Sequence, residues 1–154
     1  MNEERFYRNN HMTASLENDV PFCQSFEDFE RRWSEELLNE DTRIGDYLGR
    51  LLSKYDKAAA AVSKDAGLAF AYVGNIINGK KNNPSRNVLI SICFAIGTTF
   101  EEAQYLLKYA GHAPLYVRRK RDVIIWFGFM KHQDLHTVNG LLVERGLQPL
   151  IREK

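Results

Sequence analysis

The stretch that decides the fold runs from residue 66 to residue 81 and reads AGLAFAYVGNIINGKK. It is preceded by four consecutive alanines at 58–61, and alanine has the highest helix propensity of all residues. Glycine suits the left-handed residue that closes a helix. We therefore expect a helix over 58–66 closed by Gly67, and a second over 70–78 closed by Gly79. Two short helices joined by a tight glycine-containing turn are the signature of a helix-turn-helix motif.

Helical periodicity continues on both sides of this motif. An N-cap at 41–42 opens a helix that ends near residue 56, and Ser85 can cap another that ends at Gly97. Thr99 and Glu102 form a capping box for a further helix over 99–111. The sequence thus predicts five short helices with short connections over residues 41–111.

The stretch 66–81, followed by Pro84-Ser85 and a helix that ends FAIG at 94–97, resembles the lambda-repressor-like (Cro/XRE type) helix-turn-helix family. The resemblance covers about residues 43–111. It rests on the turn glycine, on the apolar residues 68, 73 and 76, and on the Gly79-Lys80-Lys81 loop. It implies a DNA-binding fold in which 58–66 crosses the DNA backbone and 69–78 enters the major groove. Related proteins read two half-sites, so a homodimer is implied as well.

The resemblance also marks candidate DNA-contacting residues. They are Ala69, Phe70, Ala71, Gly74, Asn75, Asn78, Lys80, Lys81 and Arg86. Only Asn75 and Asn78 carry the donors and acceptors that read base edges, most naturally adenine, whereas the two alanines can touch thymine methyl groups. The three cations fall where phosphates would lie, and such contacts give affinity without sequence preference.

The expected reading positions depart from the family pattern. The first motif helix begins with alanines where the family often has a glutamine that clamps DNA, and Ile77 stands where the family commonly has glutamate. An exposed apolar patch at 69–71 would also suit protein docking. Two functions therefore stay open: a DNA-binding transcriptional regulator, or a protein-interaction adaptor on a helix-turn-helix scaffold with weak or no DNA binding.

Outside this domain the sequence predicts three further segments. They are a flexible arm over 1–24, an acidic amphipathic helix over 25–40 with an aromatic stripe, and a C-terminal helical extension over 112–154. Periodicity leaves the apolar run 123–130 open between helix and strand. We favour helix because no other β-rich segment offers a partner for a strand. A last helix is expected to begin at Asp134 or Thr137. The expected fold class is all-α. The aromatic segments 26–37 and 123–130 are candidate dimer or capping surfaces.

The charge of the chain is unevenly distributed. The formal net charge of +1 combines about −7 over residues 1–41 with about +8 over 42–154. This asymmetry indicates an acidic extension on a basic body. Four cations at 118–121 precede the apolar run, where positive charge opposes a helix dipole unless an anion joins it. Phosphate contact and an ordinary solvated surface both remain possible for this run.

The sequence lacks the residues that several kinds of functional site need. Cys23 and Cys93 form neither a metal-binding pair nor a disulfide framework, which favours a reducing compartment. His132 and His136 have helical spacing but no third metal ligand. No catalytic or phosphate-cradling motif is present, so we expect no enzymatic activity, cofactor or metal. The chain also lacks a signal-peptide core and an apolar span of membrane length, and we expect a cytoplasmic protein with no membrane contact.

Overall fold

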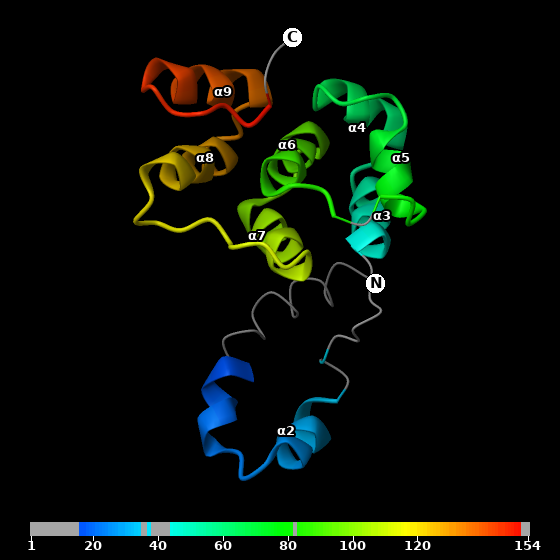
Figure 1. Cartoon of the computed structure of the whole chain (residues 1–154), viewed down its shortest axis with the longest axis vertical. Coiled ribbons are helices and arrows are strands. Elements are labelled where there is room, and N and C mark those ends of the chain that lie inside the picture. Colours follow the sequence, from blue (N-terminus) through cyan, green and yellow to red (C-terminus); the bar gives the residue numbers. More distant parts are fainter. Residues whose placement is uncertain (1–15, 35–36, 38–43, 82, 152–154) are drawn as a thin grey trace. The chain divides into compact units, whose positions relative to one another are not determined.

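The computed structural model describes residues 16–34, 37, 44–81 and 83–151, and over these residues the chain is helical with no strand (Figure 1). The expected all-α class is confirmed for this part of the chain. The chain divides into two compact units, residues 1–42 and 43–154. No helix among the described residues is long and apolar enough to span a membrane.

The first unit contains the 3-10 helix η1 (Val20–Phe22) and the helix α2 (Phe26–Trp33). As expected, Ser25 caps α2, and its side chain accepts a hydrogen bond from the backbone N–H of Asp28 at 3.1 Å. The helix ends at Trp33, earlier than predicted, and residues 35–36 and 38–40 of the expected helix lie outside the described residues. The Trp33 indole donates to the Asp19 carboxylate at 2.7 Å. No residue of η1 or α2 is buried. The aromatic side chains of α2 are therefore not packed into a hydrophobic core within the described part of this unit.

The second unit holds seven α-helices in its described residues. They are α3 (Ile44–Lys54), α4 (Ala59–Asp65), α5 (Tyr72–Ile77), α6 (Arg86–Ile96), α7 (Phe100–Tyr109), α8 (Lys120–Met130) and α9 (Leu135–Glu144). The helix α6 contacts α4, α7 and α9, while α5 packs against α3 and α4. Every apolar side chain that α6 directs inward is almost fully buried, which places the core around this helix. These residues are Leu89, Ile90, Ile92, Cys93 and Ile96.

Most of the expected helix boundaries have the capping contacts that the sequence predicted. Ser85 accepts a hydrogen bond from Val88, and Thr99 and Glu102 form the full capping box. Gly67 and Gly97 have φ angles of +75° and +87°, the left-handed conformation expected where a helix closes. Asp134 caps α9, which resolves the choice between the two possible starts of the last helix.

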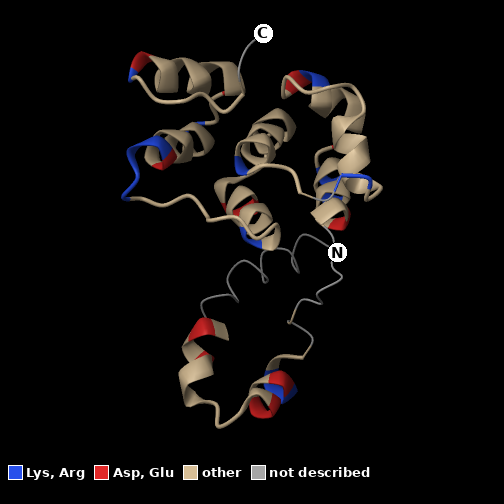
Figure 2. Ribbon diagram, viewed as in Figure 1, with Lys and Arg blue, Asp and Glu red and all other residues tan. Residues whose placement is uncertain are grey.

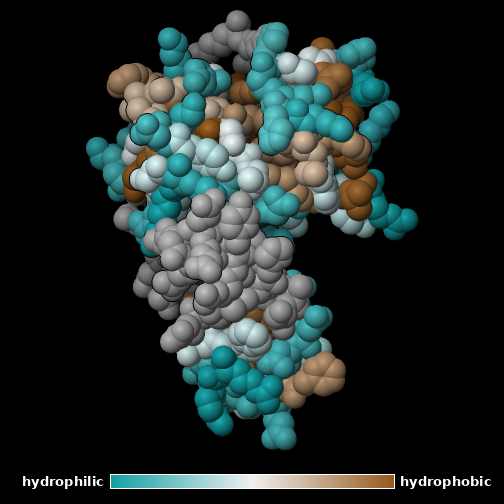
Figure 3. All heavy atoms as spheres, turned by 180° about the vertical axis from the view of Figure 1, so that it is seen from behind, coloured by the Kyte–Doolittle hydropathy of each residue, from teal (hydrophilic) through white to brown (hydrophobic). Residues whose placement is uncertain are grey.

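The apolar run 123–130 lies inside α8, as favoured from the sequence. The ring of Phe129 stacks on Phe94, and that of Trp126 on Phe100, each pair with centroids 4.0 Å apart. These contacts make α8 a cap on α6 and α7. Its opposite face leaves Phe127 and Met130 more than half exposed, and hydrophobic side chains gather on the α8–α9 side of the molecule seen from behind (Figure 3).

Candidate nucleic-acid interface

The connection between α4 and α5 is held by a buried serine. The backbone N–H of Leu68 donates to the carbonyl of Ser63 at 2.8 Å, just past the left-handed Gly67. The Ser63 hydroxyl donates to the Ala59 carbonyl and accepts from the N–H of Val73, both at 3.0 Å. Ser63 therefore fixes the start of α5 against α4. Sequence reasoning missed this residue, although a serine in an alanine-rich helix one turn before the glycine was the available signal.

A glycine in α3 supports α5 from the other side. A Cβ atom at Gly45 would lie 2.5 Å from the carbonyl oxygen of Ile76 and 2.8 Å from that of Ile77. Only a glycine allows the backbones of the two helices to come this close. Val73 and Ile76 are buried in the same contact region, so α5 is anchored on the side that faces the core.

The structure corrects the expected start of the second motif helix. The helix α5 begins at Tyr72, whereas the sequence predicted residue 69 or 70. No side chain caps this start, and a Tyr72 N–H to Ala69 carbonyl bond of 3.0 Å closes a turn ahead of it. Ala69, Phe70 and Ala71 thus lie together on an exposed turn, where the Phe70 side chain is 79% exposed.

The polar candidates lie along α5 and at its end. Gly74 and Asn75 are half-buried on the helix, and Asn78 is its C-terminal cap. The Asn78 side-chain oxygen accepts a hydrogen bond from the N–H of Lys80 at 3.1 Å. This hydrogen bond holds the side-chain oxygen of Asn78 within the turn.

The two lysines of the following loop lie close to α5. The Lys81 ammonium lies 4.5 Å from the centroid of the Tyr72 ring, and the Lys81 N–H donates to the Asn75 carbonyl at 2.9 Å. Both lysines are exposed. Figure 2 shows this basic loop at the end of α5. We call the turn 69–71, α5 and the loop 80–81 the reading face.

Arg86, the third predicted phosphate contact, is engaged elsewhere. Its guanidinium donates to the Asp122 carboxylate at 3.0 and 3.2 Å, and to the carbonyls of Ala113 and Pro114 at 2.8 and 3.3 Å. All three guanidinium nitrogens therefore have acceptors within the protein. Arg86 links α6 to α8, and we leave it out of the reading face.

The basic run 118–121 is also divided by the structure. Arg121 donates to the Asn87 side chain and to the carbonyls of Gln148 and Pro149 at 2.9–3.3 Å. The exposed cations of the run are Arg118, Arg119 and Lys120. Figure 2 shows this run on the opposite side of the second unit from the loop 80–81. The two basic segments therefore do not form one continuous surface.

Comparisons with models of protein families, with curated proteins and with solved structures found no match to this chain. Among the described residues, no group of three or more potential metal-ligating side chains occurs.

Gly74 provides a test of how the reading face tolerates change. Nothing lies within 4 Å of a Cβ added at this position, so Gly74→Ala should raise the free energy of unfolding by about 1 kcal/mol through helix propensity. Urea denaturation of the wild type and the variant measures this gain. A loss of stability would show that α5 requires glycine for a backbone reason.

Proposed function

We propose that the protein binds duplex DNA through the reading face and acts as a transcriptional regulator. One observation carries the proposal: the exposed Phe70 turn and the cations Lys80 and Lys81 belong to one short segment, which Ser63 and Gly45 hold in place. Phe70 lies between the exposed Ala69 and Ala71, and a contiguous exposed apolar patch can mark an interaction site. The DNA major groove combines phosphates at its edges with thymine methyl groups inside, which suits this mixture of side chains.

Each part of the reading face has its own role in this proposal. Lys80 and Lys81 neutralise phosphates and release counterions, which supplies affinity that falls with salt. Asn75 offers a bidentate amide to adenine, and the turn 69–71 packs against thymine methyl groups. The small side chains on either side of Phe70 let the backbone approach the base edges closely.

We further propose a homodimer, because two copies would read two half-sites about one helical turn apart. The exposed apolar side chains of α8 and α9 supply the contact surface. They are Phe127, Met130 and Val143, each between 55% and 59% exposed.

Retention of the protein on random duplex DNA at two salt concentrations tests the main proposal. Lys80→Ala and Lys81→Ala should each weaken binding to all sequences and reduce the salt slope by about one. Lys108→Ala, which removes an exposed lysine at the end of α7, is the matched control and should change neither. Asn75→Ala should relax base preference at one position by about 1–3 kcal/mol. Absence of salt-dependent retention of the wild type would overturn the proposal.

A protein-docking role is the second candidate, and the 79% exposure of Phe70 favours it as well. The two candidates differ in the expected effect of Phe70→Asp. In a DNA-binding protein the new carboxylate faces the phosphates and should weaken DNA binding. In an adaptor the change should abolish capture of a protein partner and leave DNA retention as it was.

A further inference from the structure

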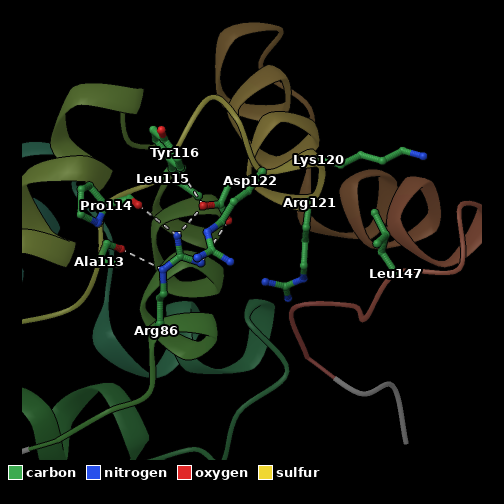
Figure 4. Close-up of a pocket in the computed structure, with 10 residues that line it drawn as sticks. Arg86, Ala113, Pro114, Leu115, Tyr116, Lys120, Arg121, Asp122 and Leu147 are labelled. Carbon is green, nitrogen blue, oxygen red and sulfur yellow. Dashed lines mark hydrogen bonds and ion pairs between the residues drawn. The ribbon is translucent and has the colours of Figure 1, made fainter.

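A cavity of about 850 Å³ opens in the second unit, away from the reading face. It lies where the start of α6, the linker before α8, the first turn of α8 and the chain after α9 meet (Figure 4). Its volume is within the range of about 300–1,000 Å³ that is typical of small-molecule sites. All residues that line it belong to the second unit.

The cavity lining carries an excess of positive charge. Four cationic residues line it, against the single carboxylate of Asp122. Arg86 and Arg121 are held by acceptors within the protein. Burial and the positive charge of Arg86 both lower the pKa of the Arg121 guanidinium. The field at this cavity is therefore unfavourable for cations and favourable for an anion.

Arg119 is the cavity cation that remains available. In the described part of the chain, its side chain makes no hydrogen bond or ion pair, and it stands at the N-cap position of α8 without a side-chain cap. The first N–H groups of the 11-residue helix α8, which have no acceptor within the helix, lie at the same N-terminal end as Arg119. Lys120 also contributes to the lining, but in Figure 4 its side chain extends away from the Arg86–Asp122 pair.

The rest of the lining is apolar. Leu115 is buried, Leu147 and Pro114 are half-buried, and the Tyr116 residue is 50% exposed beside them. Leu115 is fixed by a pair of hydrogen bonds to the Gln104 amide, at 2.6 and 3.0 Å. A ligand for this cavity therefore needs an apolar part as well as a negative charge.

We propose that this cavity binds a small organic anion, with a carboxylate or phosphate group at Arg119 and an apolar part against Leu115 and Leu147. The site is separate from the reading face, so this inference does not depend on DNA binding. It assigns Arg119, one of the three exposed cations of the basic run, to a small molecule.

Titration of the full chain with 8-anilinonaphthalene-1-sulfonate, a fluorescent aromatic anion, tests the proposal. We expect saturable binding that inorganic phosphate displaces. Arg119→Gln should raise the apparent Kd for the probe at least fivefold. Arg118→Gln removes the same charge from the neighbouring exposed residue, which does not line the cavity, and should change the Kd less than twofold.

Three results would overturn the proposal. One is non-saturable fluorescence of the folded wild type, and the second is an equal effect of the two substitutions. The third is displacement of the probe by a short DNA duplex but not by phosphate, which would assign these cations to the DNA backbone. Circular dichroism of both variants shows whether they are folded, and because both side chains are exposed, we expect unchanged helix content.

Discussion

Replacement of Asp122 by alanine should lower the free energy of unfolding by about 3 kcal/mol. The Asp122 side chain is only 5% exposed, and its carboxylate accepts hydrogen bonds from Arg86 and from the backbone N–H of Tyr116. Without it, the Arg86 guanidinium loses its carboxylate partner and keeps only the carbonyls of Ala113 and Pro114, and the Tyr116 N–H loses its acceptor. Removal of one partner of a buried ion pair costs about 3–5 kcal/mol. We expect the lower end because 23% of the Arg86 side chain is exposed.

Urea denaturation of four proteins measures this effect. They are the wild type, Asp122→Ala, Arg86→Ala and the double variant. The double variant should lose less than the sum of the single variants, because it leaves neither charge unpaired. Asp65→Ala removes an exposed carboxylate at the end of α4 and should change stability little. Equal small losses for Asp122→Ala and Asp65→Ala would show that the link between α6 and α8 contributes nothing measurable.

This ion pair also shows the limit of sequence reasoning. The sequence placed Arg86 beside the motif as a phosphate contact and did not pair it with Asp122. The two residues are 36 positions apart, and neither composition nor periodicity indicates that α6 and α8 bring them together. Arg86 was interpreted from its neighbours in the sequence, whereas its pairing with Asp122 depends on tertiary structure.

Features that depend on a few neighbouring residues were predicted correctly. Ser85, Thr99 with Glu102, and Asp134 each cap a helix within three residues of chain, so their sequence spacing contains the geometry. The left-handed Gly67 is local in the same sense. The start of α5 was predicted too early because residues 69–71 carry no capping side chain that would mark the boundary.

The residues of the reading face were proposed from the sequence, whereas the contacts that support them were not. Asn75 and the two lysines were taken from the pattern of residues 66–81, but residues 70–71 were expected to be helical and lie instead in an exposed turn. Ser63 was not predicted because its hydroxyl bonds to a backbone N–H ten residues away. The contact of Lys81 with the Tyr72 ring also requires the loop to fold back on α5. Side-chain chemistry was thus visible in the sequence, whereas the contacts that position it were not.

Replacement of Gly45 by alanine should lower the free energy of unfolding by about 3 kcal/mol, the upper end of the usual cost of overpacking. The added methyl group would lie 2.5 and 2.8 Å from the carbonyl oxygens of Ile76 and Ile77. These are backbone atoms at the end of α5 and cannot rotate away as a side chain would. Relief of the clash requires α3 and α5 to separate, which would also displace the loop 80–81.

Gly49→Ala is the matched control, because Gly49 lies one turn later in the same helix. The nearest atom to an added Cβ there is a side-chain methyl of Ile77 at 4.0 Å, so this variant should gain about 1 kcal/mol from helix propensity. Urea denaturation then separates the effect of packing from that of propensity, since both variants make the same chemical change. Similar stability of the two variants would show that α5 moves freely on α3. The reading face would then lack the rigid support that the DNA-binding proposal assigns to it.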